Sequence, residues 1–254
     1  MKPSTPDERS GGLPPDGASA EQSADLWQGP RLCHAGLLGC EQCSRLTAFR
    51  RTEHAVKGPN QLRSARYWSR PVPLFGDPDA RILLLGMAPG YHGANRTGTP
   101  FCGDVSGRLL YGALHDLGLS SHAEPEVGGL QLRLHGAAIT NAVKCVPPLN
   151  APTPDERRGC GSWLQADLAA LPNLRWIVAF GHIAHDALLD YAAIRRPGLR
   201  RSAFRFGNGR LHQLPGLPFG LVDSFHPSPL NANRGIITRA SLVELLRPLL
   251  QENP

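Results

Sequence analysis

The chain has 254 residues, of which 41% are hydrophobic and 6% aromatic, and its formal net charge is +6. This composition is typical of a globular domain, and no apolar run of about 18 residues is present that could cross a membrane. Residues 1–25 carry two basic and five acidic side chains, a net −3, and the remainder carries 25 and 16, a net +9. The basic remainder suits a polyanionic partner such as a nucleic acid, although charge alone is weak evidence for one.

The N-terminal segment differs in composition from the rest of the chain. Residues 1–25 are rich in proline, glycine, serine and acidic side chains, which predicts a disordered tail. The segment lacks the apolar core of a signal peptide, so we expect a cytoplasmic protein whose six cysteines stay reduced unless they bind metal. Residues 26–254 are too short for two full α/β domains, and we predict one domain there.

Short β-rich runs alternate with helix-like segments along this domain. The predicted strands are residues 81–87, 137–143, 176–180 and 220–224, and the predicted helices are residues 106–117, 155–171, 183–191 and 238–250. Pro154 followed by Asp155 and Glu156 is typical of a helix start, because proline fits the first turn and acidic side chains favour its positive end. The alternation predicts an α/β fold in which helices cover both faces of a parallel sheet.

A distinctive loop follows each of the four predicted strands. In chain order, these loops have the sequences GMAPGYHG, NAVKCVPPLN, GHIAH and HPSPLN. The carboxyl ends of parallel strands lie at one edge of a sheet, which is where α/β proteins bind their ligands. We therefore expect the four loops to form a single site.

The first of these loops is the most informative segment. It runs from Gly86 to Asp104 with the sequence GMAPGYHGANRTGTPFCGD. Glycines lack the Cβ atom that would block a ligand, so backbone amides as far as Gly90 can approach one closely. Asp104 adds a carboxylate at the far end, Asn141 lies at the end of the second strand, and His226 follows the fourth. Each residue alone is more often a turn, capping or packing residue, and only their convergence favours catalysis.

Four of the six cysteines have spacings that permit a metal site. Cys40 and Cys43 form a C-x2-C pair, and Cys145 and Cys160 follow farther along the chain. Four thiolates can bind zinc or an iron–sulfur cluster, but the wide spacing of the second pair is not that of a zinc ribbon. Spacing therefore leaves two alternatives, a metal site or merely buried cysteines at 145 and 160.

Other reactive side chains have less support from their context. Cys102 lies in the first loop without an evident base, so we expect it to pack rather than to act as a nucleophile. His182 and His185 lie three residues apart at a predicted helix start, and without a third ligand both are expected on the helix surface. Cys33 and His92 receive no role.

Three segments together resemble the iron–sulfur uracil-DNA glycosylases, most closely family 5, or type b. They are GMAPGYHGANRTGTPFCGD, TNAVKC with the later Cys160, and HPSPLN, and the resemblance covers residues 36–245. Met87 stands where the related family 4 has a glutamate and family 5 an apolar residue. The resemblance implies a three-layer αβα fold with a central four-stranded parallel sheet. It also implies a [4Fe–4S] cluster on four cysteines: Cys40, Cys43, Cys145 and Cys160.

The same motifs imply roles for individual residues. Asp104 matches the catalytic aspartate, and His226 matches the histidine of the second motif. Phe101 matches the aromatic ring on which the extruded base stacks, and Asn141 matches the asparagine that reads the base. The other expected substrate-binding residues belong to the first loop: Gly86, Ala88 and Gly90.

The implied activity is hydrolysis of the N-glycosidic bond of uracil in DNA, which leaves an abasic site. Hypoxanthine and xanthine are further expected bases. No lysine in either loop motif can attack the sugar, so a monofunctional enzyme is expected. The expected partner is double-stranded DNA, with single-stranded DNA left open, and the protein is expected to act as a monomer, associated with the nucleoid through DNA.

Two departures from the family pattern concern the DNA-contacting loops. Cys102 stands where threonine is expected, and Pro229-Leu230 replaces polar residues. Residues 229–234 are candidates to fill the space that the extruded nucleotide leaves and to contact phosphate.

Two other functions are compatible with parts of the sequence. One is an iron–sulfur hydrolase of small nucleotides that uses residues 86–93 to bind phosphate, although the GK[ST] ending of a P-loop is missing. The other is an iron–sulfur DNA-binding module without catalytic activity.

Overall fold

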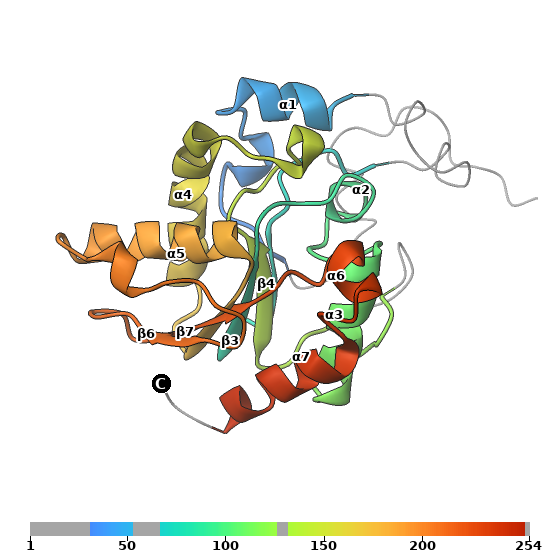
Figure 1. Ribbon diagram of the computed structural model, residues 1–254. Coiled ribbons are helices and arrows are strands. Elements are labelled where there is room, and N and C mark those ends of the chain that lie inside the picture. The colour runs from blue at the N-terminus through green and yellow to red at the C-terminus, as the bar shows by residue number, and fades with distance from the viewer. Residues whose placement is uncertain (1–30, 53–66, 126–131, 252–254) are drawn as a thin grey trace, which may run out of the picture.

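The computed structural model describes residues 31–52, 67–125 and 132–251 (Figure 1), so the predicted tail at residues 1–25 lies outside the described residues. A single sheet has the strand order β1-β2-β4-β3-β5-β7-β6. Its four central strands pair in parallel: β4 (Ala137–Asn141), β3 (Ile82–Gly86), β5 (Trp176–Phe180) and β7 (Gly220–Ser224). All five residues of each central strand are buried, and β3 and β5 accordingly read as apolar runs, whereas β4 and β7 each end in two buried polar residues.

The sheet is wider than the four-stranded parallel sheet that was predicted. β1 (Arg31–Leu32), β2 (Leu74–Gly76) and β6 (Leu211–Gln213) pair antiparallel at its edges. Each is only two or three residues long, too short to leave a periodic pattern in the sequence. The predicted α/β class is confirmed, and the sheet is seven-stranded and mixed.

Helices cover both faces of the sheet (Figure 1). One face packs against α3 (Val105–Asp116) and α7 (Arg239–Leu246), and the other against α4 (Pro154–Ala169) and α5 (His182–Arg195). Side chains alternate along a strand, so Ile82 and Leu84 belong to the core under α3, whereas Leu83 and Leu85 belong to the core under α4 and α5. The three-layer arrangement follows from this alternation.

Local signals in the sequence set several helix ends. Thr153 caps α4 in a capping box with Glu156, and Pro154 is the first helical residue. The helix predicted over residues 238–250 ends at Leu246, because Pro248 cannot donate its backbone N–H and instead begins a separate 3-10 turn.

Three short helices were not predicted: α1 (Ser44–Arg50), α2 (Ala94–Thr97) and α6 (Pro229–Asn233). Helices of four to seven residues show too few turns for an apolar periodicity. None of the helices in the described ranges has the length and hydropathy needed to cross a membrane.

Candidate active site

A pocket of about 390 Å³ opens at the carboxyl edge of the central sheet. The lining residues are Met87, Ala88, Pro89, Gly90, Ala94, Phe101, Asp104, Ser106, Asn141, Asn150, His226, Ser228 and Pro229. They come from the loops after β3, β4 and β7. The predicted convergence therefore holds for three loops, whereas residues 181–185 after β5 do not line the pocket.

Asp104 is positioned by the start of α3. It is the N-cap residue, and its Oδ1 accepts a hydrogen bond of 2.9 Å from the Gly107 N–H. Its Oδ2 lies against the first loop, where a Cβ atom built on Gly93 would be only 2.3 Å away. The absence of a side chain at Gly93 therefore gives the carboxylate its position in the pocket wall.

Phe101 lines the pocket from a strained turn. Its φ of +53° lies in the left-handed region that residues other than glycine seldom adopt. Its ring centroid lies 5.7 Å from that of Phe180 and 5.6 Å from that of His226, with the latter two rings inclined by only 25°. The turn thus places an aromatic ring between the end of β5 and the loop after β7.

Asn141 ends β4 and pairs in register with Gly86 of β3. A Cβ atom on Gly86 would lie 2.3 Å from Asn141 Oδ1 and 2.8 Å from the Phe101 ring. Gly86 itself does not line the pocket, whereas Ala88 and Gly90 do. Gly86 has no side chain, and this leaves room for the side chains of Asn141 and Phe101.

His226 follows β7 by two residues, and α6 supports its loop. Its backbone carbonyl accepts a hydrogen bond of 2.8 Å from the side-chain amide of Asn231. Burial lowers the pKa of His226, and the nearby Asp104 carboxylate opposes this effect only in part. The ring is therefore neutral at pH 7 and has one N–H to donate.

The four cysteines named by the resemblance line one small cavity: Cys40, Cys43, Cys145 and Cys160. Four cysteine thiols around one cavity form a donor set that can hold either an iron–sulfur cluster or a zinc ion.

Arg50 gives a second reason to expect an anionic group at this cavity. The residue is 2% exposed, and its guanidinium donates to Cys145 Sγ and to the Cys40 carbonyl, both at 3.0 Å. It has no ion pair with a carboxylate in the described part of the chain. A buried positive charge needs a negative partner, which thiolates bound to a cluster would supply. The backbone N–H of Lys144 also donates to Cys160 Sγ at 3.2 Å.

Comparison with known proteins places the chain in a family. The model of the uracil DNA glycosylase superfamily matches residues 73–250. The chain belongs to this superfamily.

Three relatives place the chain more closely, and each is named as a type-5 uracil-DNA glycosylase. The protein of Thermus thermophilus is 48% identical over 210 residues, covering 83% of this chain and 92% of the relative. That of Pyrobaculum aerophilum is 40% identical over 213 residues (83% and 88%), and that of Mycobacterium tuberculosis 39% over 209 residues (82% and 76%). The resemblance to type-5 uracil-DNA glycosylases is therefore confirmed.

Three polar residues that line the pocket were given no role in the predictions from the sequence. Ser106, Asn150 and Ser228 place polar side chains at the pocket wall. They stand in or beside the motif loops, but a polar loop residue does not reveal which way it points. Cys102, by contrast, is buried as expected, and burial raises the pKa of its thiol to about 11, as suits a packing residue.

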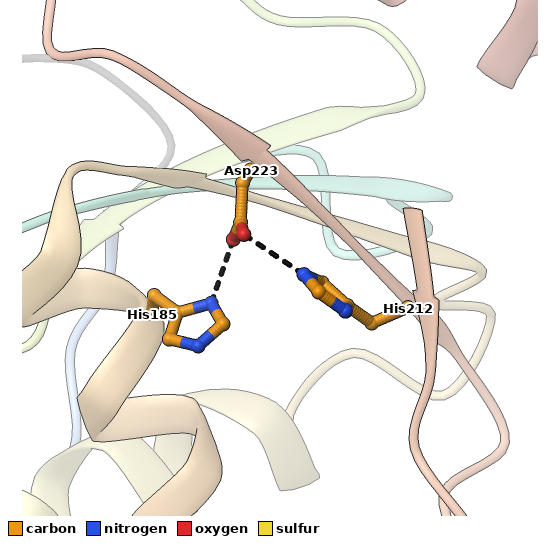
Figure 2. A group of neighbouring side chains, drawn as sticks. All are labelled: His185, His212 and Asp223. Carbon is orange, nitrogen blue, oxygen red and sulfur yellow. Dashed lines mark hydrogen bonds and ion pairs between the residues drawn. The ribbon is translucent and has the colours of Figure 1, made fainter. Parts of the chain in front are cut away.

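The prediction that His185 lies on the helix surface is wrong. His182 is exposed, but His185 is 2% exposed, because it lies on the same stripe of α5 as Leu188 and Leu189, which faces the sheet. Its Nδ1 lies 2.7 Å from Asp223 Oδ1, and His212 Nε2 lies 2.8 Å from the other carboxylate oxygen (Figure 2). We call His185, His212 and Asp223 the buried histidine network.

The buried histidine network brings three potential metal ligands within 4.8 Å of one another, but its hydrogen bonds account for it without an ion. His185 Nε2 also lies 2.8 Å from the Phe204 carbonyl. A carboxylate and a carbonyl can only accept, so the His185 ring carries both protons and has no lone pair for a metal. Burial by itself would lower the pKa of His185, but the hydrogen bond and charge of Asp223, together with the Phe204 carbonyl and the charge of Asp186, outweigh burial and raise it.

Proposed function

We propose that this chain is a DNA-repair enzyme that hydrolyses the N-glycosidic bond of uracil in DNA and leaves an abasic site. The pocket carries the proposal, because Asp104, Asn141, His226 and Phe101 all line it. The names of the type-5 relatives, which match 82% to 83% of this chain, support uracil in DNA as the substrate.

Uracil inside a duplex must be extruded before it can enter the pocket. Extrusion costs a few kcal/mol, and stacking on an aromatic ring such as Phe101 offsets about 1–3 kcal/mol of this. Leu230 on α6 is 58% exposed and follows the pocket residue Pro229, so we assign it to the space that the nucleotide leaves. The Asn141 amide offers both a donor and an acceptor to the polar edge of the base.

Bond cleavage creates positive charge on the sugar and negative charge on the departing base. The Asp104 carboxylate, held by the Gly107 N–H, stabilises the sugar cation and orients the attacking water. The neutral His226 ring donates its N–H to the departing base. Losing one such donor costs about 3 kcal/mol, or roughly a hundredfold in rate. The loops that carry Asp104 and His226 contain no lysine, and Lys144 in the loop after β4 is buried and paired with Asp167, so no amine attacks the sugar and the phosphate backbone stays intact.

The proposal extends to hypoxanthine and xanthine, because the apolar wall at Met87 and Ala88 has no polar side chain that would reject a purine. We further propose that residues 26–254 form one domain that acts as a monomer on DNA, double-stranded or single-stranded.

We also propose a [4Fe–4S] cluster on Cys40, Cys43, Cys145 and Cys160. The gathering of the four cysteines at one cavity and the buried charge of Arg50 support it. When bound, the cluster supplies covalent cross-links between segments far apart in the sequence and takes no part in the reaction.

The test uses the full chain and an oligonucleotide with one uracil. We expect free uracil and an uncut strand that breaks only on treatment with alkali. Asp104→Asn should lower the single-turnover rate at least about a hundredfold. Asp190→Asn, which alters a carboxylate on the surface of α5, is the matched control and should keep the full rate.

Three results would contradict the proposal. Full activity of Asp104→Asn would remove the assigned mechanism. Turnover of free nucleotides without uracil release would favour the small-molecule hydrolase. An adduct trapped by borohydride would show that an amine attacks the sugar.

A further inference from the structure

Three aromatic rings gather at the carboxyl edge of the sheet outside the pocket. The ring centroids of His182 and Phe206 lie 4.1 Å apart, and those of Phe206 and Phe225 lie 6.0 Å apart. His182 begins α5 just after β5, and Phe225 follows β7 directly and precedes the pocket residue His226. We call His182, Phe206 and Phe225 the aromatic strip, and it adjoins the pocket through Phe225.

The aromatic strip is open to solvent. His182 is exposed, Phe225 is 38% exposed and Phe206 is half-buried. Adjoining aromatic rings at the surface of a soluble domain are typical of an interaction site.

Positive charge accompanies the rings. Arg205 directly precedes Phe206, and Arg210 donates to the Arg205 carbonyl at 3.2 Å. Both arginines are exposed, and neither has an ion pair with a carboxylate among the residues that the structure describes. Flat aromatic rings beside exposed guanidinium groups fit a ligand that combines flat faces with negative charge, as a nucleotide strand does.

The strip is held in place without a ligand. The His185 ring of the buried histidine network meets Phe206 edge-on, with centroids 5.8 Å apart (Figure 2 shows the network). The Phe225 N–H donates to Asn208 Oδ1 at 2.8 Å. A surface fixed in advance loses little conformational entropy when it binds.

We propose that the aromatic strip binds unpaired nucleotides that flank the uracil, with a base stacked on the rings and phosphates paired with Arg205 and Arg210. This inference rests on the proposed function, which places the uracil in the adjoining pocket. Bases within a duplex are stacked on one another and do not reach the rings, whereas bases of a single strand do. The strip therefore selects single-stranded DNA beside the lesion.

The test compares the affinities of the full chain for two forms of DNA. A fluorescent single-stranded oligonucleotide with non-cleavable 2′-fluoro-2′-deoxyuridine and its duplex are titrated by anisotropy. Phe206→Ala should raise the Kd for the single strand about tenfold and the Kd for the duplex less than about twofold. Phe206→Trp should leave both Kd values unchanged. The double variant Arg205→Gln, Arg210→Gln should lower the salt slope for the single strand by about 1.4, because each phosphate contact contributes about 0.7.

His182→Ala is a second variant that guards against misfolding, because it removes an exposed ring rather than one that packs on His185. It should weaken single-strand binding in the same direction with an unchanged unfolding temperature. Unchanged single-strand affinity in both alanine variants, or equal losses for both DNA forms, would overturn the inference. Absence of uracil release by the unsubstituted protein would overturn the proposed function alone, because the anisotropy measurement decides the role of the strip independently.

Discussion

Two glycines of the first loop set the positions of the pocket side chains. A Cβ atom would lie 2.3 Å from Asn141 Oδ1 if built on Gly86, and 2.3 Å from Asp104 Oδ2 if built on Gly93. Gly93 combines a φ of −92° with a ψ of −113°, which lies outside the α and β regions that other residues occupy. Glycine is therefore needed at position 93 for its backbone conformation as well as for the space that it leaves.

Gly93→Ala tests this requirement. The added methyl group must displace the Asp104 carboxylate, and a shift of about 1 Å in a catalytic group costs about a hundredfold in rate. We expect that loss in single-turnover uracil release, with a cooperative thermal unfolding transition retained. Gly161→Ala on α4 is the matched control, because no atom lies within 4 Å of its added Cβ. Full activity of Gly93→Ala would contradict the steric account of the pocket.

At the scale of elements, the buried histidine network joins α5 to the sheet edge formed by β6 and β7. The groups that face His185 are Asp223 of β7, His212 of β6 and Asp186 of its own helix. Since β7 leads directly into the loop with His226, the network anchors a strand that positions the pocket.

The network predicts a pH-dependent stability. The pKa of His185 in the folded protein is raised, and that of an unfolded histidine is about 6.5. The stabilisation is therefore complete below pH ~6.5 and is lost as the pH rises through the folded pKa. Urea unfolding between about pH 6 and 9 should show the free energy of unfolding falling for the unsubstituted protein.

The comparison of two variants isolates His185 in that experiment. In His185→Gln, the free energy of unfolding should fall less between about pH 6 and 9 than in the unsubstituted protein. In His115→Gln, at an exposed position of α3, it should fall as much as in the unsubstituted protein. If the free energies of unfolding of His185→Gln and the unsubstituted protein differed by the same amount at every pH, the His185 ring would not be charged.

At the scale of the whole molecule, the cysteine cavity joins segments that are distant in the sequence. Cys43 caps α1, Cys145 lies after β4, and Cys160 is part of α4. An ion pair between Arg45 and Glu156 also links α1 to α4. The proposed cluster would thus link the N-terminal segment that contains α1 to the core of the three-layer fold.

Loss of one cysteine ligand of the proposed cluster should weaken this link between the N-terminal segment and the core. Cys145→Ser is expected to lower the iron content and visible absorbance of the purified protein. It should also lower the unfolding temperature by roughly 5 °C or more, because a bound metal group contributes directly to folding free energy. Cys33→Ser, at an exposed cysteine, should change none of these. Equal iron content in both variants would remove the cluster assignment.

The sequence by itself determined the four central strands, the principal helices and the motif residues of the pocket. β3 and β5 are buried on both faces and therefore leave apolar runs, and the start of α4 is marked locally by Pro154 and the acidic residues that follow it. The pocket motifs were recognisable because they stand directly after those strands.

Only the tertiary structure decided the rest, because it depends on contacts between residues far apart in the chain. The edge strands are too short to leave a pattern, and the contact of Arg50 with Cys145 spans 95 positions. The burial of His185 and the gathering of Phe206 with Phe225 likewise follow from how helices and loops pack on the sheet. Local periodicity records which face of an element is apolar, but not which distant side chain meets it.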